Sequence, residues 1–126
     1  MEKIEVKQIT KSAAADALRA AGLVDPTGQF TPESLAASGA AFELTTARGA
    51  GVFVAEVRGD RLWIHGAGAV GSKNLTQDGL ELFDAMALAG GCRFIRFETD
   101  RAGLVRLSKK AGFKTRAVVM EKELKK

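Results

Sequence analysis

The chain has 126 residues, of which 46% are hydrophobic, so it is long enough to fold as a single domain, residues 1–126, around a sizeable core. No apolar run approaches the length that crosses a bilayer, no signal-peptide centre is present, and a lone cysteine excludes an internal disulfide, so the cytoplasm is expected. The net charge of +4 is uneven, because residues 92–126 hold 11 Lys/Arg against 4 Asp/Glu whereas residues 1–91 hold 8 against 11. This asymmetry indicates either a solvated basic face or a surface for an anionic partner.

The first 40 residues predict one strand and two helices. Apolar residues alternate from Ile4, which marks the strand, and an alanine-rich helix follows over about 13–21. The Thr-Pro-Glu run at 31–33 supplies a cap, a proline at the first helical position and an acid in the first turn. A second, short helix is therefore expected to end near residue 38.

Three strands and a helix are predicted next. The strands are expected over 41–47, 52–57 and 61 to about 67. Short connections such as Arg-Gly-Asp at 58–60 are typical of antiparallel hairpins. After a glycine-rich loop, an apolar stripe at helical spacing predicts a helix over 77–89.

The last third predicts a strand, a helix and a second strand. The aromatic and β-branched run at 92–99 is typical of a buried strand, and Asp100 can cap the helix that follows it. Gly112 is suited to the left-handed residue that ends a helix, and Phe113 is expected to fold back onto the last turn. Residues 115–123 then alternate as a strand does.

The end of this helix, Leu-Ser-Lys-Lys-Ala-Gly-Phe at 107–113, resembles the LYEKLGF segment of the GNAT acetyltransferase superfamily. The expected order β-α-α-β-β-β-α-β-α-β also resembles that of the superfamily over nearly the whole chain. The resemblance implies an α+β, GNAT-like fold with a mixed, mostly antiparallel central sheet of about six strands flanked by about four helices. It also implies that the protein binds acetyl-CoA or another acyl-CoA and transfers the acyl group to an amine on a small molecule or a protein.

Two positions of this region depart from the superfamily pattern. Ser108 stands where many members carry the tyrosine that protonates the leaving thiolate, and the chain has no tyrosine. Arg101 stands where an asparagine is usual, and either it or Arg106 is a candidate to pair with a cofactor phosphate. The alternative is that both lie on the solvated face of the helix. The chain thus resembles a small, degenerate member, and whether it is an enzyme stays open.

The run Gly-Ala-Gly-Ala-Val-Gly at 66–71 has the spacing of a dinucleotide fingerprint. The preceding strand belongs to an antiparallel meander, however, and too few residues follow for a doubly wound sheet. The resemblance makes this run the loop that holds the CoA pyrophosphate, although the superfamily pattern Gln/Arg-x-x-Gly-x-Gly/Ala is absent. The residues expected to bind the cofactor there are Gly66, Ala67, Gly68, Val70, Gly71, Ser72 and Lys73. A loop that needs glycine only to turn is the alternative.

Acyl transfer to an amine needs a base, donors for the developing oxyanion and an acid for the leaving thiolate. His65 is the candidate base, because it is the only side chain whose ordinary pKa suits neutral pH. Glu98, and also Glu56, are candidates to activate a water, and Ser108 takes the position of the acid. A packed histidine and ordinary strand carboxylates are the alternatives. Cys92 is expected to be a core residue, and no residues have metal-ligand spacing.

Two other functions stay open. One is a GNAT-fold protein without catalysis, a binding or assembly module of the kind also found among phage genes. The other is a binder of nucleic acid or of an acidic protein through the basic residues of 92–126. Nucleic acid is not favoured, because these residues do not alternate with aromatic side chains that look exposed. A homodimer would cover a sheet edge left bare at the C-terminus, and a membrane partner is not expected.

Overall fold

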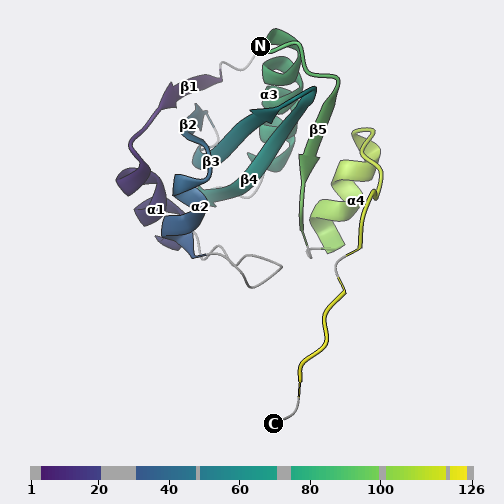
Figure 1. The fold of residues 1–126 in the computed structure, drawn as a ribbon. Helices are drawn as coiled ribbons and strands as arrows, with labels where there is room; N and C mark the ends of the chain where they lie inside the picture. The colour runs from purple at the N-terminus through teal and green to yellow at the C-terminus, as the bar shows by residue number, and fades with distance from the viewer. Residues whose placement is uncertain are drawn as a thin grey trace.

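The computed structural model describes residues 4–20, 31–47, 49–70, 75–99, 102–118 and 120–124 (Figure 1). In these residues the chain follows the predicted order through its first nine elements. They are β1 (Glu5–Gln8), α1 (Lys11–Ala20), α2 (Pro32–Ala37), β2 (Ala40–Thr46), β3 (Gly49–Arg58), β4 (Arg61–Val70), α3 (Leu75–Ala89), β5 (Phe94–Phe97) and α4 (Ala102–Lys110).

The strands form one five-stranded sheet whose order in space, β1-β2-β3-β4-β5, repeats their order along the chain. Antiparallel pairing joins β1 to β2, β2 to β3 and β3 to β4. β5 joins β4 in parallel, after the chain crosses over through α3. The predicted sheet, mixed and mostly antiparallel, is therefore confirmed.

One face of the sheet is covered by α1 and α2 (Figure 1). α1 turns Ala14 and Leu18 inward, one helical turn apart, and α2 adds Leu35. These side chains pack on Val52 and Val54, alternate residues of β3 that point to the same face. The small alanines of α1 let this helix lie close to the sheet.

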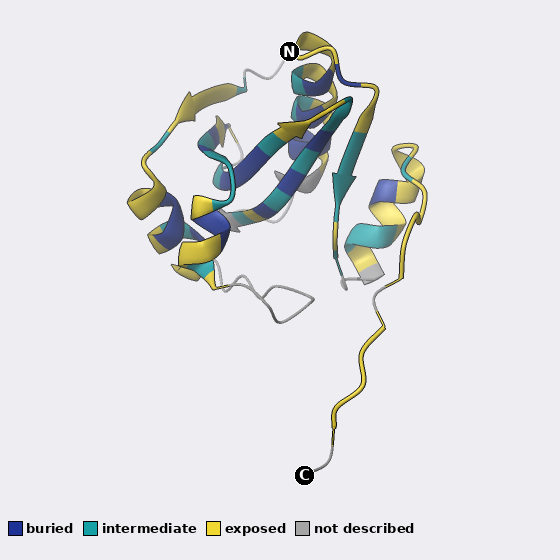
Figure 2. Cartoon of the chain, viewed as in Figure 1, coloured by how far each residue is buried: buried dark blue, intermediate teal, exposed yellow. Residues whose placement is uncertain are grey.

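The opposite face is covered by α3, which buries Leu80, Phe83 and Ala87 at helical spacing. Phe53 of β3, only 2% exposed, stands at the centre of this layer. Its ring stacks on Phe42 at 5.2 Å and meets the Phe83 ring edge-on at 5.1 Å. Figure 2 shows the alternation of buried and more exposed residues along the central strands that such two-sided packing produces.

The end of α4 has the geometry that the sequence predicts. Gly112 has a positive φ of 97°, and the N–H of Phe113 donates to the carbonyl oxygen of Ser108 at 3.0 Å. The N–H of Gly112 donates to the carbonyl oxygen of Lys109 at 3.1 Å, which completes a Schellman motif. Phe113 thereby turns back and meets the Phe97 ring edge-on at 5.2 Å, so this cap fastens the end of α4 to β5.

The strand predicted over 115–123 is not formed, and the described sheet has five strands rather than six. Residues 114–118 and 120–124 are exposed and adopt no regular structure, and they lead away from the folded body (Figures 1 and 2). Val118 and Met120, expected on one face of a strand, are 75% and 87% exposed.

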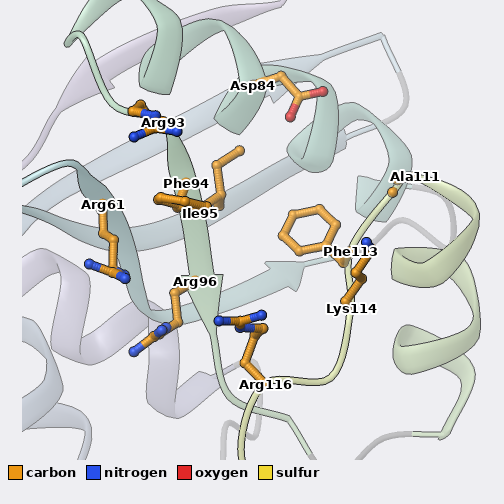
Figure 3. Close-up of a pocket in the computed structure, with 11 residues that line it drawn as sticks. Arg61, Asp84, Arg93, Phe94, Ile95, Arg96, Ala111, Phe113, Lys114 and Arg116 are labelled. Atoms are coloured by element: carbon orange, nitrogen blue, oxygen red, sulfur yellow. The ribbon is translucent and has the colours of Figure 1, made fainter.

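Charge accounts for the missing pairing between this segment and β5. Lys114 and Arg116 line the same groove as Arg93 and Arg96 (Figure 3). Like charges directly opposite each other destabilise a strand pair. The prediction of a strand from the alternation of apolar residues was wrong, because such a pattern carries no information about the charges that the strand would face.

Candidate functional site

The two parallel strands β4 and β5 begin side by side and then diverge (Figure 1). Residues 61–64 of β4 pair with residues 94–97 of β5, and Ile64 opposite Phe97 is the last pair. β4 continues to Val70, still paired with β3, whereas β5 ends at Phe97. Along residues 65–70 the β5 side of β4 therefore has no strand partner among the described residues, and we call this break in the pairing of the two strands the opening.

A bulge in β4 marks the point where the strands diverge. Gly66 pairs with Val54 of β3, but Ile64 pairs with Ala55, so His65 is an extra residue in β4. A bulge bends its strand and re-aims the side chain at that position. His65, the bulged residue, follows directly after Ile64, the last residue of β4 that pairs with β5. The bulge therefore lies where the pairing of the two strands ends, and it places His65 at that point.

His65 lies beside a carboxylate on the sheet face that α3 does not cover. Its side chain is 16% exposed, and its Nε2 atom is 3.6 Å from Oε1 of Glu56. The imidazole stacks on the Trp63 indole, with ring centroids 6.0 Å apart and 7° between the planes. Within the described residues Nε2 is buried without a hydrogen-bond partner, so a proton on this atom would face Glu56.

The carboxylate of Glu56 is held in its charged form. The Arg58 guanidinium donates a hydrogen bond from Nε to Oε1 of Glu56, and this contact is the main reason that the pKa of Glu56 lies below its ordinary value. The positive charge of Arg58 and the nearby His65 act in the same direction, while partial burial opposes them. At neutral pH Glu56 is therefore ionised, and its negative charge lies beside the His65 imidazole.

The other two predicted catalytic residues do not meet His65. Ser108 is buried in α4 and is only 4% exposed. In the described part of the chain, two buried side-chain polar atoms lack a hydrogen-bond partner, and they are Oγ of Ser108 and Nε2 of His65. A buried polar atom without a partner is unusual and calls for an explanation, such as a ligand or a water. Glu98 is exposed directly after β5. The carboxylate beside His65 is Glu56, the less favoured of the two glutamates.

The glycine run at 66–71 begins within strand β4 and not in a loop. Gly66, Ala67 and Gly68 belong to β4 and pair with Val54, Phe53 and Val52 of β3, and Val70 is the last residue of the strand. The expectation of a turn from Gly66 onward was wrong, because backbone pairing with β3 continues through the glycines. The remaining predicted cofactor ligands, Gly71, Ser72, Lys73 and Arg101, lie outside the described residues.

Around the hairpin end of β4 and the start of β5, the structure assembles a surface that the sequence analysis missed. We call it the arginine–aromatic surface, and it consists of Arg58, Arg61, Trp63, Arg93, Phe94 and Arg96. The guanidinium carbons of Arg58 and Arg96 lie 6.0 and 5.1 Å from the centre of the Trp63 ring. Those of Arg61 and Arg93 lie 5.1 and 5.5 Å from the centre of the Phe94 ring. The signal was present, since Arg and aromatic residues alternate at 61 and 63 and again at 94 and 96.

A groove of about 430 Å³ adjoins this surface along the outer edge of β5 (Figure 3). Besides Phe94 and Phe113, the described residues that line it include several cations and a single carboxylate, Asp84. The cations are Arg61, Arg93, Arg96, Lys114 and Arg116. This edge of the protein is therefore strongly positive.

Other kinds of site find no support in the described ranges. No group of three or more His, Cys, Asp or Glu in them is placed to hold a metal ion. No helix among the described elements is long and apolar enough to cross a bilayer. Cys92 is buried in the core, as expected from the sequence.

Comparison with known proteins finds relatives by structure alone, since no family model and no curated protein sequence matches the chain. Aminoglycoside N-acetyltransferase AAC(6')-Iy in complex with CoA superposes with a TM-score of 0.57 at 12% identity, over 98% of this chain and 96% of that one. An acetyltransferase from Trypanosoma brucei gives 0.55 at 11% identity, over 97% and 100%. Glucosamine-6-phosphate N-acetyltransferase from Arabidopsis thaliana gives 0.51 at 13% identity, over 98% and 99%.

These matches span nearly the full length of both partners, so they compare whole domains rather than a shared motif. The sheet order, the divergence of β4 from β5 and the Gly-Phe end of α4 agree with the resemblance noted in the sequence. The chain has the fold of the GNAT acetyltransferases.

Proposed function

We propose that the protein binds an acyl-CoA in the opening between β4 and β5 and transfers its acyl group to an amine. The observation that carries the proposal is the end of β4–β5 pairing at Ile64 and Phe97, while β4 continues to Val70. The likeness to an aminoglycoside N-acetyltransferase in complex with CoA supports the choice of cofactor.

The residues around the opening fit an acyl-pantetheine chain. Alternate residues of a strand direct their N–H and C=O groups to the same edge, and along 65–70 the β5 edge of β4 is free of a strand partner in the described structure. The amides of a pantetheine arm can pair with such an edge as a strand would. Of the predicted residues Gly66, Ala67, Gly68 and Val70, those whose backbone groups face this edge would hold it.

The phosphates are assigned to residues that follow the strands in sequence. Gly71, Ser72 and Lys73 come directly after β4, and α3 begins two residues later. Backbone N–H groups, a hydroxyl and an ammonium before a helix start are suited to a pyrophosphate. Arg101, just before α4, would pair with a further phosphate oxygen.

His65 is assigned as the base that takes a proton from the attacking amine. Its buried Nε2 atom faces the ionised carboxylate of Glu56, so Nδ1 would take the proton from the amine while the Nε2–H group points to Glu56. Glu98 is the second candidate, acting through water from the end of β5. The acyl-CoA supplies an activated thioester whose acyl group is transferred to the amine.

Ser108 is assigned as a hydrogen-bond donor near the departing sulfur. It occupies the tyrosine position of the GNAT-like segment, and its buried Oγ lacks a hydrogen-bond partner within the described chain. A serine hydroxyl is a much weaker acid than a phenol at neutral pH. It therefore stabilises the leaving group by a hydrogen bond, and solvent provides the proton.

Calorimetry tests whether the protein binds CoA, and it compares ligands with and without the pantetheine arm. We expect CoA and acetyl-CoA to bind at least about tenfold more tightly than adenosine 3′,5′-bisphosphate, which lacks the arm. Release of thiol from acetyl-CoA in the presence of a panel of amines then measures transfer. No heat with either form of CoA, or equal affinity for CoA and the bisphosphate, would contradict a site between the strands. Binding without transfer would identify a non-catalytic acyl-CoA binder instead.

A further inference from the structure

The arginine–aromatic surface runs along the β4–β5 pair from its hairpin end and reaches the opening at Trp63, which stacks on His65. Arg61 pairs with Phe94, and Trp63 pairs with Arg96, in parallel register. Residues paired in this way point to the same face of a sheet, as do residues two apart in one strand. Arginine and aromatic side chains therefore alternate along and across the two strands on one face, opposite Leu62 and Ile64, which are buried under α3.

From this arrangement we infer that the arginine–aromatic surface binds single-stranded nucleic acid. Bases would stack on Trp63 and Phe94 and on the guanidinium planes beside them, while the arginines neutralise the phosphates. Arg61, Arg93, Phe94 and Arg96 have no part in the groups assigned to CoA or to the proton transfer, whereas Arg58 also holds Glu56 and Trp63 also stacks on His65.

Two of the four arginines of the surface have a carboxylate partner. Arg58 pairs with Glu56, and Arg61 lies 3.2 Å from a carboxylate oxygen of Asp60. Among the described residues no ion pair forms at Arg93 or Arg96, whose guanidinium groups lie over the Phe94 and Trp63 rings. Cations that the protein itself does not neutralise attract a polyanion and release its counterions.

The neighbouring groove extends the same charge along the outer edge of β5. Lys114 and Arg116 line it on the segment after α4, and Figure 3 shows them across the groove from β5. Asp84 is the only carboxylate among the described residues of the lining. A ligand longer than one nucleotide would therefore meet further cations after it leaves the two rings.

Exposed rings distinguish nucleic acid from other anionic partners such as an acidic peptide. Phe94 is 47% exposed although it lies next to buried core strands, and Trp63 is only partly buried. A partner recognised by charge alone would gain nothing from an accessible phenyl ring. Stacking of a base on an aromatic side chain contributes more than a solvent-exposed ion pair, and every base offers a flat face.

Trp63 is the only tryptophan of the chain, so its fluorescence reports directly on this surface. We would titrate the full-length protein with oligo(dT) and oligo(U) of about 12 nucleotides at about 50 mM salt, the two arms separating DNA from RNA. We expect saturable quenching by at least one of them, with an affinity that falls steeply as salt rises. Absence of quenching by both at low salt would overturn the inference.

Two matched pairs of substitutions test the charge. Arg93→Ala with Arg96→Ala should weaken binding about tenfold or more and flatten the salt dependence, because two phosphate contacts are lost. Lys109→Ala with Lys110→Ala removes the same charge from the exposed end of α4 and should change the affinity less than about twofold. Equal weakening by both pairs would show a diffuse charge effect and overturn the assignment to this surface.

Phe94→Leu separates stacking from charge, since it removes the ring but keeps an apolar side chain and every cation. We expect severalfold weaker binding with an unchanged salt slope. Polyphosphate, which has the charge but no bases, should compete poorly. Unchanged binding by Phe94→Leu together with efficient competition by polyphosphate would identify a generic anion surface and reject nucleic acid. The thermal midpoint of each variant verifies folding, and Arg93→Lys with Arg96→Lys provides a charge-conserving substitute if the alanine pair unfolds.

Discussion

Nε2 of His65 lies 3.6 Å from Oε1 of Glu56, so the extra residue of β4 and a carboxylate of β3 form a pair beside the opening. Arg58 holds the carboxylate charged from the other side. The pair thus places an imidazole, which can accept a proton, beside a fixed negative charge. This arrangement leads to the first two predictions.

His65→Gln should lower the rate of acetyl transfer at saturating acetyl-CoA by about 100-fold, because general-base catalysis contributes roughly 10²–10⁴-fold. The affinity for CoA, measured by calorimetry, should not change. Glu98→Gln provides the comparison, since this residue is the second candidate base. If Glu98→Gln abolishes transfer and His65→Gln leaves it intact, the two roles are reversed.

The stability of the protein should depend on pH through Glu56. Its pKa is lowered in the folded state from the ordinary value of 4.5, mainly by the hydrogen bond from Arg58. A carboxyl with a lowered pKa stabilises the fold above the unfolded pKa, and this contribution disappears as the pH falls through the folded value. The unfolding temperature of Glu56→Gln should therefore lie below that of the unchanged protein at about pH 6 and approach it below about pH 4.

Thermal unfolding followed across this pH range measures the difference, with Glu123→Gln in the exposed C-terminal segment as the control. A gap between Glu56→Gln and the unchanged protein that stays constant from neutral to acid pH would show that ionisation of Glu56 makes no contribution. Because the Arg58–Glu56 pair is partly solvated, the gap should be small.

Ser108→Ala should separate stability from activity. The Ser108 Oγ is buried without a hydrogen-bond partner in the described structure, so its removal leaves no donor or acceptor stranded and should leave the unfolding temperature unchanged or raised. Acetyl transfer should fall, while CoA binding persists. Destabilisation by about 1 kcal/mol or more in denaturant titration would indicate instead that Ser108 has a structural hydrogen bond.

Replacement by alanine should change the stability of the protein in opposite directions at the two ends of α4, at Gly103 near its start and at Gly112 in its C-terminal cap. Gly112 has a φ of 97°, so Gly112→Ala should destabilise the protein by about 1–2 kcal/mol. Gly103 lies inside α4, where an added Cβ meets nothing within 4 Å, so Gly103→Ala should stabilise it by about 0.5–1 kcal/mol. Urea unfolding of both variants measures the contrast, and effects of the same sign would contradict this account of the helix end.

Features that depend on neighbours in the sequence were predictable. The Gly112–Phe113 cap, the apolar stripe of α3 and the hairpins follow from local residue types, and all are confirmed. The β-bulge at His65 was not predictable, because a bulge is defined by the register of the opposite strand. The same limit explains why β4 runs through the glycines.

Charges that meet only in three dimensions account for the remaining differences. A strand over 115–123 has the right alternation, yet its first cations would face those of β5. Likewise, Arg61 and Phe94 are far apart in sequence, and only the parallel register places their side chains together. Local alternation shows which residues share a face, but not which residues of another strand stand beside them.

The identity between strand order in space and strand order along the chain has a consequence for how the protein folds. The hairpins that join β2, β3 and β4 close short loops, and the entropy lost on closure is correspondingly small. The joins between β1 and β2 and between β4 and β5 must instead bridge helices, and contacts distant in sequence slow folding. The β2–β3–β4 meander is therefore expected to assemble first, and the two edge strands, β1 and β5, to add to it later.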